Sequence, residues 1–220
     1  MVGSLLSSDS TISPALLVLL RTIAKSIAAI LVFCLAAQPA YAHLVGVEFG
    51  DFYAGALHIV SAPEHLAILF GVALLAAFHP REASRWILLG VLVGLAAGVV
   101  IAAFTPLEIP LESAVAITLI LAGILGVVAR PMPAAALVVI GGVIAMVHSF
   151  VNAASASTVD VDWLLYGGGI VAAGTALIIL FIAAVATLAE AVSWMRVAAR
   201  ALSSWISAIG FLYLAVSLIA

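Results

Sequence analysis

Residues 163–188 read WLLYGGGIVAAGTALIILFIAAVATL, a run of 26 residues without one charged side chain. A helix that crosses the hydrocarbon core of a bilayer needs about 20 apolar residues, so this run is long enough to span a membrane. A transmembrane β-barrel needs short segments of alternating polarity, whereas this run is continuously apolar. The segment therefore predicts a membrane-spanning helix and an all-α fold.

The rest of the chain has the same character, because 67% of its 220 residues are hydrophobic and only 8% are charged. No water-soluble domain of this length tolerates so apolar a surface. We therefore expect a polytopic transmembrane helical bundle of about six spans within one domain. The expected spans cover residues 64–79, 86–104, 112–129, 134–153, 163–188 and 200–219.

The segment 48–63 is apolar but short, and glycine, aspartate, histidine and proline interrupt it. It predicts a short re-entrant or interfacial segment before the first span. The glycines 90, 94 and 98 repeat every four residues, which indicates close packing against another helix or another copy of the chain. For the glycines at 167–169, a flexible helix entrance and small-residue packing are both open interpretations.

The N-terminus has the features of a secretory signal, since Arg21 and Lys25 precede an apolar run. Ala40-Tyr41-Ala42 then supplies a small-x-small cleavage pattern. We expect a signal peptide over residues 1–42 and a mature domain over 43–220 that begins at His43. The alternative is an uncleaved anchor helix.

The charge pattern predicts the orientation in the membrane. The arginines at 81, 85, 130, 196 and 200 all fall in alternate connections, so the positive-inside rule makes these connections cytoplasmic. The mature N-terminus is then extracytoplasmic, and the protein lies in a bacterial inner membrane.

The basic residues are scattered singly, so nucleic acid is not an expected partner. The expected partners are lipid, a metal ion, and a membrane protein or a second copy of the chain.

Ionisable residues at membrane depth are the candidates for chemistry, because burying them in hydrocarbon is costly. The inferred topology places five of them at the extracytoplasmic side, and His43 is a sixth candidate at the new N-terminus. Imidazole and carboxylate together suit divalent nickel, cobalt, zinc or copper better than magnesium or calcium. The alternative is a set of buried polar groups that bond between helices. The candidate metal ligands are His58, Glu64, His65, Glu112, His148 and His43.

Two stretches resemble signatures of the HupE/UreJ family. Residues 55–66, GALHIVSAPEHL, are similar to its H-P-x-x-G-x-D-H-L motif, with Glu64 in place of the aspartate. Residues 109–116, IPLESAVA, resemble its P-x-E-x-x-I-A-x-S segment, with Glu112 as the glutamate. His148 fits the first histidine of a His-rich run, while Phe150 and Asn152 replace the next two.

The resemblance extends over nearly the whole mature chain and implies nickel or cobalt uptake. The first hypothesis is therefore a permease that captures a divalent transition metal on the outside. A second is an intramembrane hydrolase in which the same residues hold zinc. A third is a non-catalytic membrane subunit whose metal site has degenerated. The residues leave the question of an enzyme open, although transport is favoured.

Overall fold

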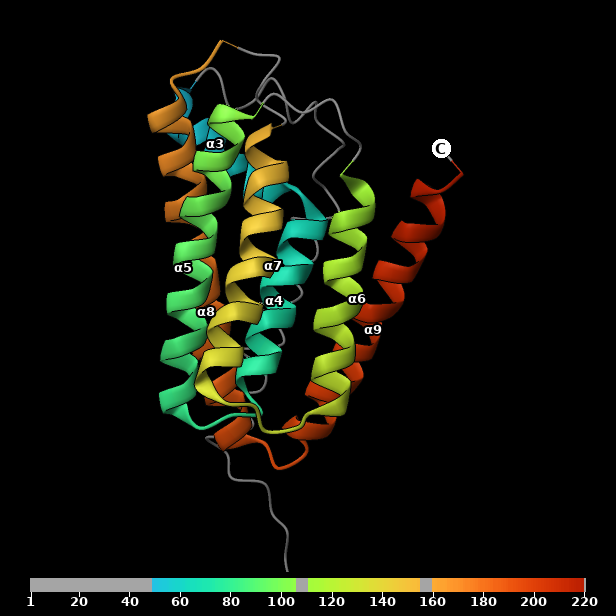
Figure 1. Ribbon diagram of the computed structural model, residues 1–220. Coiled ribbons are helices and arrows are strands. Elements are labelled where there is room, and N and C mark those ends of the chain that lie inside the picture. The colour runs from blue at the N-terminus through green and yellow to red at the C-terminus, as the bar shows by residue number, and fades with distance from the viewer. Residues whose placement is uncertain (1–48, 106–110, 155–159, 220) are drawn as a thin grey trace, which may run out of the picture. The chain divides into compact units, whose positions relative to one another are not determined.

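The computed structural model describes residues 49–105, 111–154 and 160–219. The chain divides into a unit of Met1–Tyr41 and a unit of Ala42–Ala220, and every described helix belongs to the second. The predicted signal peptide and His43 lie outside the described residues. The described ranges contain helices and no strand, which confirms the all-α fold class (Figure 1). The helices are α3 (Asp51–Ser61), α4 (Pro63–Ala76), α5 (Arg81–Phe104), α6 (Glu112–Val128), α7 (Ala134–Ala154), α8 (Trp163–Ala191) and α9 (Met195–Ser217).

Four of these helices, α5, α7, α8 and α9, are long and apolar enough to cross a membrane. The helix α6 has 17 residues, which at 1.5 Å per residue cover about 25 Å of a hydrocarbon core roughly 30 Å thick. The expected first span corresponds to α4, but α4 has only 14 residues. By length and composition the described helices give four spans, or up to five if the bent pair of α3 and α4 counts as one, which is roughly consistent with the expected bundle of about six.

The helices α3 and α4 meet at an angle of 71°, as a broken span or a re-entrant loop. The break lies at Ala62, whose backbone is extended, and Pro63 is the first residue of α4. Proline suits this place because the first turn of a helix leaves its backbone N–H groups unpaired in any case. The bent pair agrees with the expected re-entrant or interfacial segment before the first span.

The helix α3 is held against α8 at both the backbone and the side chains. A methyl group on Gly55 would collide with the backbone of Tyr166, and one on Gly169 would collide with that of Phe52. The carboxylate of Asp51 accepts a hydrogen bond of 2.8 Å from the backbone N–H of Asp162. The glycines at 167–169 therefore belong to a regular helix, in which Gly167 packs against Val99 and Gly169 against Phe52, and this favours the packing interpretation over a flexible entrance.

The glycines of α5 pack against the backbone of α7. A methyl group on Gly90 or Gly94 would collide with the backbone of Val138 or Gly142, and one on Gly98 with that of Met146. The contact repeats at intervals of four residues, so three successive turns of α5 lie directly on α7. The expected close packing is thus an internal contact.

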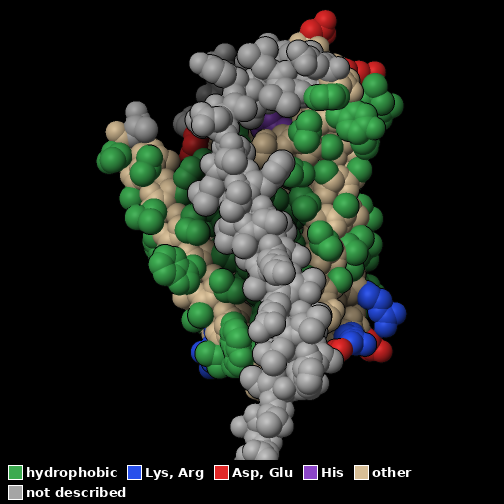
Figure 2. All heavy atoms as spheres, turned by 180° about the vertical axis from the view of Figure 1, so that it is seen from behind, with side chains coloured by type: hydrophobic (Ala, Val, Ile, Leu, Met, Phe, Trp, Pro, Cys, Tyr) green, Lys and Arg blue, Asp and Glu red, His purple; other side chains and the backbone are tan. Residues whose placement is uncertain are grey.

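The helix α4 provides the centre of the bundle, since most of its residues from His65 to Ala76 are buried. Figure 1 shows it between α7 and α6. The arginines gather at one end of the described unit, where Glu82 and Glu190 lie beside Arg85 and Arg81. All five described arginines lie at the end where α5, α7 and α9 begin (Figures 1 and 2). Asp51, Asp160 and Asp162 lie at the other end, so the alternation used to predict orientation is present in space.

Candidate functional site

Two histidines from distant parts of the chain meet inside the bundle. His65 is the third residue of α4, His148 lies in the second half of α7, and their exposed fractions are 2% and 3%. Their Nδ1 atoms are 2.8 Å apart, and the two rings stand nearly perpendicular at 80°. Polar groups are costly in an apolar interior unless they are hydrogen-bonded, so this pair is a stable arrangement only because each ring supplies a partner for the other.

Thr118 of α6 is the third member of this cluster, which we call the histidine pair site (His65, His148 and Thr118). Its hydroxyl oxygen lies 2.8 Å from Nε2 of His148 and 2.8 Å from the carbonyl oxygen of Val115. The sequence analysis did not select Thr118, because a single hydroxyl in an apolar span is common. A usable signal was its place six residues after Glu112, where the P-x-E-x-x-I-A-x-S pattern also ends on a hydroxyl residue.

The remaining candidates lie toward the same end of the bundle but not in one cluster. His58 of α3 is half-buried and exerts an electrostatic effect on His65. Glu64 is half-buried and Glu112 is exposed, and both carboxylates act electrostatically on the phenol of Tyr213 on α9. Histidines and carboxylates thus form two neighbouring groups. Among the described residues, no three His, Cys, Asp or Glu side chains stand close enough together to hold a metal ion.

The adjacent residues Glu64 and His65 project differently, as expected for neighbours on a helix. Next to His148, the hydroxyl of Ser149 donates a hydrogen bond of 2.5 Å to the carbonyl oxygen of Leu95. This bond fixes the α7 turn that carries His148 against α5. Asn152, one turn beyond His148 on the same face, is also buried. Its position matches a lost histidine of the family pattern, so the polar character of this face is retained.

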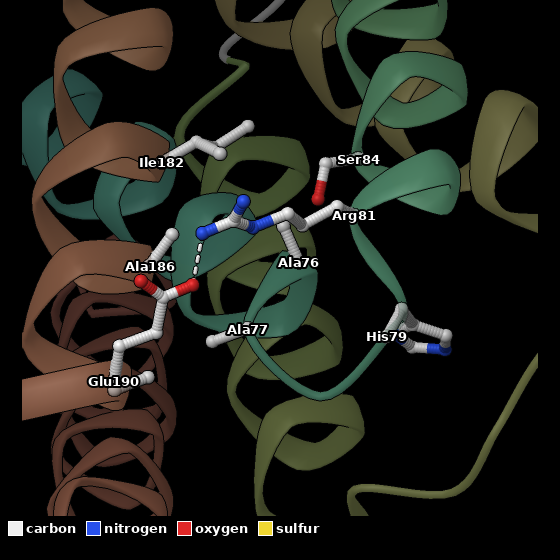
Figure 3. A pocket seen from close by; sticks show the side chains of 9 residues that line it. Ala76, Ala77, His79, Arg81, Ser84, Ile182, Ala186 and Glu190 are labelled. Atoms are coloured by element: carbon white, nitrogen blue, oxygen red, sulfur yellow. Dashed lines mark hydrogen bonds and ion pairs between the residues drawn. The ribbon is translucent and has the colours of Figure 1, made fainter.

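The opposite end of the bundle contains a second group of polar residues (Figure 3). Arg81 at the start of α5 pairs with Glu190 at the end of α8, beside a pocket of about 160 Å³ lined by α4, α5 and α8. Both side chains are mostly exposed, so the ion pair contributes little to stability. His79 donates from Nδ1 to the carbonyl oxygen of Leu75 and accepts at Nε2 from the N–H of Met132. Both ring nitrogens of His79 therefore form hydrogen bonds, which link the end of α4 to the α6–α7 connection.

A bundle of apolar helices with two hydrogen-bonded histidines at its centre defines a helical membrane protein with an internal polar site. The chain also matches the family model described as HupE / UreJ protein over residues 31–213, which is most of its length. It therefore belongs to the HupE/UreJ family, and the resemblance seen in its motifs is confirmed. Membership relates it to nickel- and cobalt-related membrane proteins. No curated protein and no solved structure matches the chain.

Proposed function

We propose that this protein is a permease-like membrane protein that binds a divalent transition metal at the histidine pair site. The observation that carries the proposal is the burial of two imidazoles, 2.8 Å apart, in a bundle whose core is mostly apolar. Retaining them costs more than an apolar replacement, so a use for their lone pairs is the simplest reason for their presence. Imidazole nitrogen is a preferred ligand of nickel, cobalt, zinc and copper.

The neighbouring polar residues would attract the ion and guide it to the histidine pair site. The carboxylates of Glu64 and Glu112 attract a hydrated cation to this end of the bundle. His58, half-buried on α3, would pass the ion toward the buried pair, and a signal-cleaved chain would add the amine and imidazole of His43. We infer nickel or cobalt as the cargo from the family, with zinc and copper as chemically suitable competitors.

A route beyond the histidine pair site would follow the contact between α6 and α9. Past His65, the buried stretch of α4 is apolar as far as Ala76. Among the described residues, buried serines continue from Thr118 along the seam between α6 and α9, at Ser207 and Ser203. Hydroxyls and backbone carbonyls replace part of an ion's water shell, whereas an apolar wall does not. We infer that transport, if coupled to this site, opens this seam.

The direction of transport rests on the charge pattern. We propose that the arginine end faces the cytoplasm and the histidine pair site faces outward in a bacterial inner membrane. Cysteines introduced at Arg130 and at Asp160, labelled from outside in intact cells, test this arrangement. Labelling at position 160 alone supports it, and labelling at position 130 alone reverses the direction.

The direct test is a titration of purified protein with nickel, cobalt, zinc and copper, combined with elemental analysis. We expect about one ion per chain and weaker binding as the pH is lowered, because protons then compete for the imidazoles. His65→Ala should lower the affinity by about 10-fold or more. His79→Ala, at the opposite end of the bundle, is the matched control and should leave the affinity per folded molecule unchanged.

Other outcomes separate the competing functions. A wild-type protein that binds no metal, and whose His65→Ala variant behaves in the same way, contradicts the proposal and favours a non-catalytic subunit. Tight zinc binding with hydrolysis of an added lipid, but without uptake into vesicles, favours the intramembrane hydrolase. Uptake of nickel or cobalt into vesicles that contain the protein supports the permease.

A further inference from the structure

The hydrogen-bond partners of Thr118 determine where its hydroxyl hydrogen lies. A backbone carbonyl can only accept, so the hydroxyl donates to the carbonyl oxygen of Val115, 2.8 Å away. A hydroxyl has one hydrogen, and its oxygen can therefore only accept from Nε2 of His148, which also lies at 2.8 Å. Thr118 is thus an acceptor toward the histidine, although a threonine can in general play either part.

This acceptor fixes the tautomer of His148. The ring must carry its hydrogen on Nε2 in order to donate to Thr118, and a neutral imidazole then has a lone pair on Nδ1. That lone pair faces Nδ1 of His65 at 2.8 Å. Two nitrogens at this separation share one hydrogen, so Nδ1 of His65 is the donor. The direction of all three hydrogen bonds follows from the single carbonyl of Val115.

The tautomer of His65 determines which of its atoms can bind a metal. With the hydrogen on Nδ1, the remaining lone pair lies on Nε2, on the side of the ring away from His148. A metal held by both Nδ1 atoms would need to displace the shared hydrogen and turn both lone pairs toward itself. Ligation through Nε2 of His65 requires neither change, because a histidine ligand commonly donates its other N–H to a fixed acceptor.

We propose that Thr118 is a positioning residue that sets the tautomers of His148 and His65, so that His65 presents an unprotonated Nε2. In this arrangement His65 is the metal ligand, and His148 accepts its hydrogen bond and orients it without binding the metal itself. The inference rests on the proposed function for its purpose, but the hydrogen positions exist whether or not a metal binds. It also explains why a side chain on α6 contributes to a site formed by α4 and α7.

Replacement of the hydroxyl tests the inference directly. Thr118→Val keeps the shape of the side chain and removes the acceptor, whereas Thr118→Ser keeps the acceptor. Thr187→Val is the matched control, because the exposed hydroxyl of Thr187 bonds only to the backbone carbonyl of Ala183 on α8. The first measurement is nitrogen NMR of protein with isotope-labelled histidine, in lipid and without metal. His65→Gln and His148→Gln assign the two rings.

We expect the wild type to carry hydrogen on Nε2 of His148 and on Nδ1 of His65. Thr118→Val should redistribute both tautomers and weaken nickel or cobalt binding by about 10-fold. Thr118→Ser and Thr187→Val should keep the wild-type spectrum and affinity. A threonine that acted only through packing would make the serine variant, which loses a methyl group, the weaker one, so this order of effects distinguishes the two roles.

Two results would overturn the inference. One is a wild-type spectrum with the hydrogen of His65 on Nε2, and the other is a Thr118→Val protein whose tautomers are those of the wild type. Failure of the proposed function looks different, since the wild type would then bind neither nickel nor cobalt while its histidines still show the expected tautomers. The spectrum therefore decides the role of Thr118 even where the titration fails.

Discussion

Two pairs of helices use small residues in different ways. Where α5 meets α7, three glycines of one helix lie on the backbone of the other, and the buried hydroxyl of Ser149 on α7 donates across the contact to the carbonyl oxygen of Leu95 on α5. Where α6 meets α9, Gly123 and Gly126 face Ser207 and Ser203. The helix α5 also packs against α8, whereas α9 has few contacts with any helix except α6. Its outer face carries exposed large apolar side chains that suit contact with lipid (Figure 2).

The comparison shows that small residues can allow close packing of two helix backbones or a helix contact lined by serine side chains. In the α5–α7 pair, contact between the two backbones and the hydrogen bond from Ser149 to Leu95 hold the helices together and make the pair a support for His148. In the α6–α9 pair, the buried hydroxyl of Ser203 bonds to the carbonyl oxygen of Ala199 in its own helix. That hydroxyl needs no partner on α6, so α9 can shift without leaving it unpaired. The following predictions test this contrast in stability.

The largest effect is expected for Gly94→Ala. The added methyl group would collide with the backbone of Gly142, which cannot move without shifting α7, so we expect a loss of about 1–3 kcal/mol in stability. Gly168→Ala is the control, because the nearest heavy atom to its added methyl group is 3.9 Å away. Thermal unfolding in lipid nanodiscs measures both. Equal unfolding midpoints for the two variants would show that α5 and α7 are not in close contact.

A smaller effect is expected for Gly126→Ala, about 1 kcal/mol. Its added methyl group would meet the side chain of Ser203, with the Cβ atom 2.7 Å away, and α9 can yield more easily than α7 because it contacts few helices besides α6. Ser203→Gly should relieve the clash, so the double variant should be more stable than Gly126→Ala alone. Additive losses in this double-mutant cycle would contradict a direct contact between these two positions.

The smallest effect concerns the ends of α6 and α9. The hydroxyls of Ser113 and Ser217 are 3.3 Å apart, and the hydroxyl of Ser217 also lies 2.9 Å from the carbonyl oxygen of Leu214 in its own helix. Ser217→Ala should therefore change stability by less than about 0.5 kcal/mol. Ser149→Ala is the contrasting variant, because its hydroxyl links α7 to α5 at full burial. A larger loss at Ser217 than at Ser149 would reverse the comparison between the two helix pairs.

The helices could be located from the sequence because hydropathy and helix length are local properties. The expected span at 163–188 corresponds to α8 within a few residues, and the others fall on α4 to α9 in order. The first span was the exception, since a run of apolar residues does not reveal that the chain turns by 71° before Pro63. The proline and glycines there indicated an interruption, but not its angle.

The site was predictable by residue type and not by contact. His65 and His148 were selected because ionisable groups are scarce in an apolar chain, and they do meet. The five described candidates were expected in one cluster, but among the described residues no three His, Cys, Asp or Glu side chains stand close enough together to hold a metal ion. Metal binding by these residues stays a prediction. Thr118 was missed because its importance depends on a neighbour 30 residues away in the chain.

The sequence by itself determined that this is an all-α membrane protein of the HupE/UreJ family, and which scarce polar residues it retains. The all-α membrane class needs only composition and periodicity, because lipid imposes it on each segment separately, whereas the family follows from the resemblance of the motifs and the match to the family model. Only the tertiary structure decided that α7 covers the glycines of α5 and that Thr118, His148 and His65 share one chain of hydrogen bonds. Such contacts depend on distances and angles between helices. The sequence around His65 or His148 does not show that their Nδ1 atoms lie 2.8 Å apart.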